Sequence, residues 1–288
     1  MDLLTVLSFE ALRAVASLAL ISVGLAIIFG MMRVINLAHG EFLMLGGYAA
    51  IVANKAGINI WVAVLVVAPI VVGLIGVVIE RAIIRFLYGR PRDTMLATWG
   101  LSLFLIGITT TIFGNTTEGI SAPAGSLEVG NYRIAAYSLI IVLIAAAVFA
   151  AIWAVMSFTK YGLIARSTMQ NPEMAASLGV SPPTVYAVTF GIGAGLAGLA
   201  GGVMAPVTGI VPTIGAAYVA KAFITVIGGG PAVLAGTVSA SVLFGAIDQI
   251  VTFLSTPVIG EVALLAAAVV LLRFMPQGIT GRFFRRSS

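Results

Sequence analysis

The chain has 288 residues, of which 60% are hydrophobic and only 9% are charged. Soluble domains carry about 25% charged residues, so this composition excludes a water-soluble globular fold and indicates a protein of the lipid bilayer. Because lipid offers the backbone no hydrogen bonds, we expect an all-α polytopic transmembrane bundle. The net charge of +5 does not indicate nucleic-acid binding, since the basic residues cluster at the ends of apolar segments, as membrane anchoring predicts.

Apolar segments recur along the whole chain, which we therefore treat as a single transmembrane domain, residues 1–288. A helix needs about 20 apolar residues to cross the hydrocarbon core. Leu37–Ala53, Ile214–Gly228 and Val258–Leu272 are weaker candidates, because each is short or carries a charged side chain. The sequence thus predicts eight or nine spans, depending on whether a weak segment is re-entrant. The strong candidates are Ala14–Met32, Ile60–Ile79, Thr94–Phe113, Ile134–Ser157, Thr184–Val207 and Pro231–Leu254.

The distribution of Lys and Arg predicts the orientation, because basic loops stay on the cytoplasmic side. This rule places the loops Arg81–Asp93 and Lys160–Pro183, and the basic C-terminus, in the cytoplasm. Gly114–Tyr132 contains no Lys or Arg and is expected to face outward. Four crossings are then needed after the second cytoplasmic loop, so Ile214–Gly228 is expected to span the membrane. The side of the N-terminus stays open.

Two glycine-containing segments resemble each other. Gly24–Gly30 reads Gly-Leu-Ala-Ile-Ile-Phe-Gly, and Gly195–Gly201 reads Gly-Leu-Ala-Gly-Leu-Ala-Gly. Each precedes a polar break and a short segment with an embedded charge. Corresponding interrupted segments in two halves are typical of transporters with an internal repeat and broken helices. Such short matches also arise by chance in this composition, so both explanations stay open.

The residue types do not favour catalysis. The chain has one histidine and no cysteine, and no lysine follows a glycine-rich turn at the spacing of a phosphate-binding loop. We therefore expect no catalytic residue, no metal site and no cofactor in this chain. If ATP drives its activity, the ATP is bound by another subunit.

A polar stretch from Arg33 to Glu41 lies between two apolar runs and contains Asn36 and His39. Ionisable groups near the bilayer are costly and usually face a cavity or a partner. One interpretation is a gate or a break that lines a substrate path. The alternative is a short cytoplasmic turn, in which Asn36 caps the next helix and Glu41 lies near its first turn.

Lys221 and Asp248 are charged residues within apolar segments. We expect them to pair inside the bundle and to contribute to the same path. The alternative is that such residues lie at span ends and extend toward water, as is equally expected for Glu261.

The loop Lys160–Pro183 contains a predicted compact helix, Asn171–Gly179. Asn171 is a good N-cap, Glu173 complements the helix dipole and Gly179 ends the helix. A short, well-capped cytoplasmic helix between two spans suits docking to a partner. The alternative is an interfacial helix that rests on lipid, for which the apolar face is small.

Several of these motifs together resemble one family. Gly24–Gly30, Val34-Ile-Asn-Leu-Ala-His-Gly-Glu41, the helix Asn171–Gly179 and Ala222–Gly236 are similar to the membrane subunits of the branched-chain (hydrophobic) amino-acid uptake family of ABC importers. The resemblance covers nearly the whole chain. It implies a bacterial inner-membrane permease that works with a second related permease, two cytoplasmic ATPases and a periplasmic or lipid-anchored binding protein.

The resemblance also implies roles for particular residues. Glu173, Ala176 and Gly179 match the family's Glu-Ala-Ala-type element that couples the permease to its ATPase. Leu87–Pro91 and Leu96–Gly100 look similar to the urea and short-amide branch, so the expected substrate is either a branched-chain amino acid or urea and short amides. The competing hypotheses are a passive channel for a small neutral solute, which needs no docking helix, and a membrane-embedded enzyme.

Overall fold

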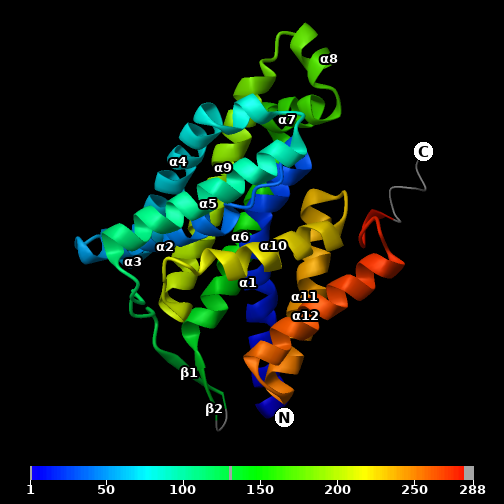
Figure 1. Ribbon diagram of the computed structural model, residues 1–288. Helices are drawn as coiled ribbons and strands as arrows, with labels where there is room; N and C mark the ends of the chain where they lie inside the picture. The colour runs from blue at the N-terminus through cyan, green and yellow to red at the C-terminus, as the bar shows by residue number, and fades with distance from the viewer. Residues whose placement is uncertain (1, 130–131, 282–288) are drawn as a thin grey trace. The chain divides into compact units, whose positions relative to one another are not determined.

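The computed structural model describes residues 2–129 and 132–281. Within this part of the chain the fold is helical apart from one two-stranded antiparallel sheet (Figure 1), as the predicted helical bundle requires. The elements are α1 (Asp2–Met32), α2 (His39–Lys55), α3 (Ile60–Val62), the π-helical turn η1 (Ala63–Val67), α4 (Ala68–Ala82), the 3-10 turn η2 (Ile84–Leu87), α5 (Pro91–Phe113), β1 (Ser126–Val129), β2 (Tyr132–Ala135), α6 (Ala136–Phe158), α7 (Lys160–Gln170), α8 (Pro172–Ser177), α9 (Pro182–Thr208), α10 (Gly215–Gly229), α11 (Val233–Leu254) and α12 (Pro257–Phe274).

Seven helical segments of the described residues are long and apolar enough to cross a membrane, and the chain is a multi-pass membrane protein. The predicted number of eight or nine spans is not exact, because two of the predicted segments form shorter helices. These are α2, with 17 residues, and α10, with 15. At 1.5 Å per residue α10 extends about 22 Å, less than the roughly 30 Å of the hydrocarbon core. The length of α10 therefore does not support the full crossing that the predicted orientation requires at residues 214–228.

The chain forms two compact units. The larger contains residues 24–120 and 149–219, and the smaller contains the described parts of residues 1–23, 121–148 and 220–288. The larger unit holds the polar break, the two predicted cytoplasmic loops and α9.

The core of the larger unit is built by α2 and α4 packing against α9. The Phe42 and Phe190 rings meet edge to face with centroids 5.9 Å apart. Close approach of the helices depends on Gly46 of α2 and Gly198 of α9. A Cβ on Gly46 would overlap the backbone of Gly198, and a Cβ on Gly198 would overlap the Val72 side chain of α4. Small residues at helix crossings are the usual means of tight packing in membranes.

The smaller unit is centred on α11 and α12, which pack side by side (Figure 1). Phe244 of α11 is fully buried, and its ring covers Gly228 of α10, where an added Cβ would lie 2.7 Å from a ring carbon. The other members of this apolar cluster are Leu18, Ala240, Leu264 and Ala268.

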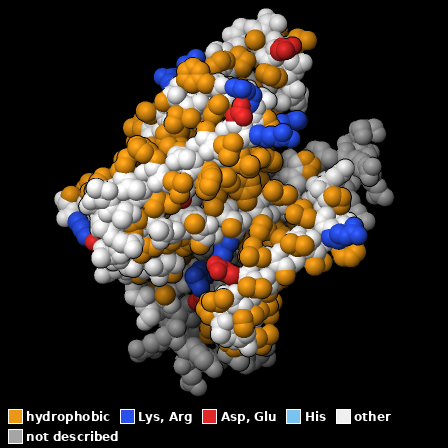
Figure 2. Space-filling view, in the orientation of Figure 1, with side chains coloured by type: hydrophobic (Ala, Val, Ile, Leu, Met, Phe, Trp, Pro, Cys, Tyr) orange, Lys and Arg blue, Asp and Glu red, His pale blue; other side chains and the backbone are white. Residues whose placement is uncertain are grey.

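Many large apolar side chains lie on the outer surface, and Figure 2 shows them over α5 and over α12. Phe104 of α5 is 62% exposed and Val269 of α12 is 70% exposed. On a soluble protein such faces would mark an interaction site, whereas on membrane-spanning helices they are the surface that lipid covers.

The structure also adds elements to the two loops predicted from the sequence. The segment expected as an outward loop, 114–132, contains β1, and the loop Lys160–Pro183 contains α7 as well as α8. The arginines that indicated a cytoplasmic C-terminus, at positions 282, 285 and 286, lie outside the described residues.

Candidate functional site

The polar stretch after α1 interrupts the helical path. Residues 33–36 are irregular, Leu37 and Ala38 form a turn, and α2 begins at His39. Arg33 adopts a left-handed conformation with φ of 52°, which is uncommon for a residue other than glycine. The Asn36 side-chain oxygen accepts a hydrogen bond of 3.1 Å from the Ala38 N–H, so Asn36 stabilises the turn. The N-cap of α2 is Ala38, and Asn36 is therefore not the helix cap that the alternative interpretation required.

Thr98 of α5 completes the hydrogen bonding of this break. Its hydroxyl accepts from the Leu37 N–H at 3.1 Å, and it donates toward two carbonyl oxygens, that of Ile35 at 3.2 Å and that of Met95 in its own helix at 3.1 Å. Thr98 is fully buried, so no water competes for these backbone groups. This role could not be read from the sequence, because Thr98 is 61 residues away from Leu37 and a threonine hydroxyl in a helix ordinarily bonds to a carbonyl of its own helix.

The three predicted path residues Asn36, His39 and Glu41 are all buried at the break, with exposed fractions of 0%, 0% and 1%. The Asn36 amide nitrogen and one Glu41 carboxylate oxygen have no hydrogen-bond partner among the described residues. Ser102 of α5 contributes a hydrogen bond to the Glu41 carboxylate. A buried polar group without a partner costs about 1–3 kcal/mol, so this region retains polar groups at the expense of stability.

The first turn of α10 lies against the first turn of α2. Gly40 and Gly215 meet so closely that a Cβ on either would overlap the backbone of the other. The Glu41 carboxylate lies at the same contact, 2.7 Å from where a Cβ of Gly215 would stand. Helix N-termini carry positive partial charge, so this contact brings two positive helix ends together beside one carboxylate.

Lys221 and Asp248 belong to the smaller unit and do not form the predicted pair. Lys221 forms an ion pair of 2.6 Å with Glu261 of α12, and Asp248 contributes no ion pair among the described residues. Asp248 instead lies beside the start of α12, with its carboxylate 3.0 Å from where a Cβ of Gly260 would stand. The sequence does not show whether Lys221 pairs with Asp248 or with Glu261, because the partner depends on how α10, α11 and α12 pack.

The predicted cytoplasmic helix is α8. The Asn171 side chain accepts from the Met174 N–H at 2.9 Å, as an N-cap does. At the other end Gly179 has φ of +85°, and the N–H groups of Gly179 and Val180 donate to the Ala176 and Ala175 carbonyls. This is a Schellman motif, which satisfies the last carbonyl groups and requires a left-handed residue at the Gly179 position.

The surface of α8 is largely open. Glu173, Ala176 and Gly179 are exposed, and so are the apolar side chains of Met174 (60%) and Leu178 (79%). Ala175 is 3% exposed and belongs to the packed side of the helix.

Helix α7 links this region to α9 and was not predicted. The Tyr161 hydroxyl lies 3.0 Å from the Thr189 hydroxyl of α9. The Arg166 guanidinium donates to the Met156 carbonyl near the end of α6. A displacement of α7 and α8 would thus act on both flanking spans.

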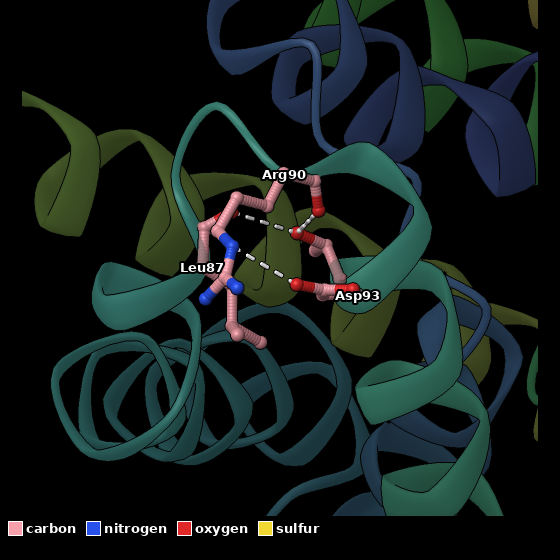
Figure 3. Close-up of polar contacts among 4 residues, drawn as sticks. Leu87, Arg90 and Asp93 are labelled. Carbon is pink, nitrogen blue, oxygen red and sulfur yellow. Dashed lines mark hydrogen bonds and ion pairs between the residues drawn. The ribbon is translucent and has the colours of Figure 1, made fainter.

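The second predicted cytoplasmic loop, Arg81–Asp93, is also ordered by local contacts. Figure 3 shows Arg90 and Asp93 in an ion pair, with N–O distance 3.0 Å, at the start of α5. The Thr94 hydroxyl donates toward the carbonyls of Leu87 and Arg90, at 3.1 and 2.9 Å. Burial raises the pKa of the Tyr88 hydroxyl, and its hydrogen bond to the Glu80 carboxylate raises the pKa further, so Tyr88 stays a donor at physiological pH.

Comparison with known proteins places these features in a wider group. Residues 7–277 match the family described as the permease component of branched-chain amino acid transport systems. The high-affinity branched-chain amino acid transport system permease protein LivH of Escherichia coli K12 is 28% identical over 95% of this chain and 94% of its own length. BraD of Pseudomonas aeruginosa, described in the same words, is 27% identical over 92% and 91%. Among solved structures, PsaBC from Streptococcus pneumoniae in complex with Fab matches with a TM-score of 0.49 and 12% identity, covering 97% of this chain and 94% of the other.

Proposed function

Since the family match extends over residues 7–277, the chain belongs to the family of permease components of branched-chain amino acid transport systems, and we propose that it forms the membrane path of an ATP-driven importer for branched-chain amino acids. The observation that carries this proposal is that match, together with relatives of nearly equal length that are named as permeases of such systems. The partners in this proposal are a second related permease, two cytoplasmic ATPases and a periplasmic or lipid-anchored binding protein, assembled at a bacterial inner membrane.

The path in this proposal runs by the break between α1 and α2. Irregular backbone at membrane depth is tolerated only where protein buries it or where it lines a water-filled cavity. Asn36 and Glu41 retain unpartnered polar atoms there, and the N-terminal turns of α2 and α10 meet at Gly40 and Gly215. A zwitterionic amino acid suits this chemistry, because helix N-termini attract its carboxylate and the Glu41 carboxylate attracts its ammonium group.

Lys221 and Asp248 have a secondary place in this proposal. Lys221 is already paired with Glu261, so its charge is balanced within the smaller unit. We assign these two residues a structural role within the smaller unit, where their charges fix the packing of α10, α11 and α12.

The ATPase is proposed to act through α8. Its exposed residues Glu173, Ala176 and Gly179 form a short rigid surface, and α7 carries a displacement of that surface toward α6 and α9. A passive channel would have no use for such a helix.

Uptake measurements test the function directly. The chain is produced with the permease, ATPases and binding protein of its own transport system in a strain that lacks leucine uptake, and the entry of labelled leucine is compared with that of labelled urea. We expect leucine uptake that stops when the ATPase is inactivated. Urea uptake without leucine uptake would replace the proposed substrate, and solute entry that persists without ATP hydrolysis would contradict an importer in favour of a channel.

A further inference from the structure

Two hollows on the larger unit lie one after the other along the same pair of helices. The first is a pocket of about 390 Å³ at the C-terminal end of α4 and the N-terminal end of α9. The second is a groove of about 470 Å³ between the middle parts of the same two helices. The α4 residues of the groove run from Pro69 to Val77, and those of the pocket begin at Glu80. One helical turn, about 5 Å, therefore separates the two.

The pocket is cationic and polar. Arg81 and Arg85 line it together with Ser181 and Thr184. Both guanidinium groups belong to exposed residues, and neither forms an ion pair among the described residues. Glu80 also lines the pocket, but the residue is 1% exposed and its carboxylate accepts a hydrogen bond from the Tyr88 hydroxyl, so it presents little surface to a ligand.

The groove is apolar, and small residues form its floor. Gly73 of α4 and Gly191 and Gly195 of α9 form that floor, because without side chains the two backbones approach closely. Ile70, 55% exposed, and Ile192, 40% exposed, are among the side chains that form its walls. From Pro69 to Val77 the groove extends about 12 Å along the helix axis, at 1.5 Å per residue.

We propose that the pocket and groove together bind one anionic phospholipid of the leaflet next to the Arg81–Asp93 loop. The phosphate lies between Arg81 and Arg85, and one acyl chain lies in the glycine-floored groove. Basic pockets between membrane helices on the cytoplasmic side are typical sites for anionic headgroups. Phe86, next to Arg85, supports this placement. Its side chain is 69% exposed, and the Arg85 guanidinium lies 5.5 Å from its ring centroid. An apolar anchor and a cation thus lie together at the expected depth of the lipid headgroups.

The continuity of the two hollows identifies the occupant. A soluble anion would use the pocket and leave the groove empty, and an apolar helix of another subunit would use the groove and leave two arginines uncompensated. A phospholipid with a negative headgroup neutralises the two arginines of the pocket and fills the apolar groove with an acyl chain. The two helices cross the membrane, and the pocket lies at the end that the basic loops assign to the cytoplasm.

Native mass spectrometry of the purified full-length chain tests this proposal, with phosphatidylglycerol and phosphatidylcholine of the same acyl length as probes. We expect phosphatidylglycerol to stay bound and phosphatidylcholine to dissociate. The double variant R81Q/R85Q should bind phosphatidylglycerol about thirtyfold more weakly, since each basic residue near a membrane surface contributes about fivefold. The control R92Q removes an exposed arginine from the same loop outside the pocket, and it should bind as the unmodified chain does.

The groove is tested separately with Ile192→Trp, which fills it from its exposed wall. This variant should weaken the binding of long-chain phosphatidylglycerol while the circular dichroism of the protein stays unchanged. Equal retention of the two lipids, or unchanged binding in R81Q/R85Q, would overturn the proposal. Competition by glycerol 3-phosphate as strong as that by the intact lipid would reduce the site to an anion pocket and also overturn it. Loss of ATPase co-purification in R81Q/R85Q, with lipid binding intact, would reassign the arginines to protein docking.

Discussion

Thr98 stabilises the break between α1 and α2 from a third helix. Its hydroxyl serves the Leu37 N–H and the Ile35 carbonyl, two backbone groups that a continuous helix would have paired internally. Because the break is buried, no water replaces the hydroxyl if it is removed. A single side chain thereby makes an irregular backbone compatible with the membrane interior.

Replacing Thr98 by valine keeps the side-chain volume but removes this hydroxyl. We expect the variant to lose about 1–3 kcal/mol of stability, because it leaves a buried N–H and a carbonyl without partners. The thermal unfolding midpoint in detergent measures the loss, and Thr98→Ser should restore most of it. Thr111→Val is the matched control, since the Thr111 hydroxyl bonds only to the Gly107 carbonyl of its own helix on an exposed face of α5. An equal loss of stability in both variants would refute the role of Thr98.

His39 lies at the first position of α2 and is fully buried at the break. If the break lines the transport path, His39→Leu should lower substrate uptake on the order of tenfold, equivalent to about 1.4 kcal/mol in the barrier. The amount of protein in the membrane should stay unchanged. His39→Gln keeps a polar group of similar size and should retain more activity. Full uptake by His39→Leu would assign the segment a purely structural role.

At the scale of elements, α8 is the most sharply defined part of the predicted coupling surface. It has an N-cap at Asn171 and a Schellman motif at Gly179, so its ends are fixed without help from distant residues. It is also exposed, and α7 connects it to α9 through Tyr161. Such a helix can transmit a displacement as a rigid body.

Gly179→Ala tests this coupling with a small change. The added Cβ meets no atom within 4 Å, but φ of +85° costs an alanine about 1–2 kcal/mol, so the end of α8 should loosen. We expect ATP hydrolysis by the reconstituted complex to respond less to substrate, while the membrane part stays folded. Gly57→Ala is the control, because Gly57 has φ of +89°, equally open space and a position in the turn after α2.

A bulky residue on the exposed face of α8 gives an independent test. Ala176→Trp should lower the amount of ATPase that co-purifies with the chain, because the large side chain prevents close docking without entering the core. If ATPase binding, hydrolysis and uptake are unchanged in both Gly179→Ala and Ala176→Trp, α8 is not the coupling helix. The loop Arg81–Asp93 then becomes the next candidate.

At the scale of the whole molecule, the orientation in the membrane is a prediction that single cysteines can test, since the chain has none of its own. A cysteine at Arg90 should be protected in intact cells from a reagent that does not cross the membrane. A cysteine at Thr116, in the segment predicted to face outward, should react. Labelling of Arg90 and protection of Thr116 would invert the orientation.

The span positions could be read from the sequence because hydropathy and helix ends are local properties. Thr184–Val207 was expected and α9 covers Pro182–Thr208; Ile134–Ser157 was expected and α6 covers Ala136–Phe158. The ends of α8 followed from Asn171 and Gly179 in the same way. Even α2 and α10, predicted as weak segments, are helices, and only their length departs from a full crossing.

Neighbours along the chain decide the membrane class, the positions of the helices, the caps of α8 and the polar character of residues 33–41, so these features could be read from the sequence. The tertiary structure alone decided that Thr98 supports the break, that Gly40 meets Gly215, and that Lys221 pairs with Glu261 instead of Asp248. The physical reason is that these contacts join residues tens of positions apart. They depend on which helix faces pack together, and in a chain of uniformly apolar spans the periodicity of the sequence does not distinguish one face from another.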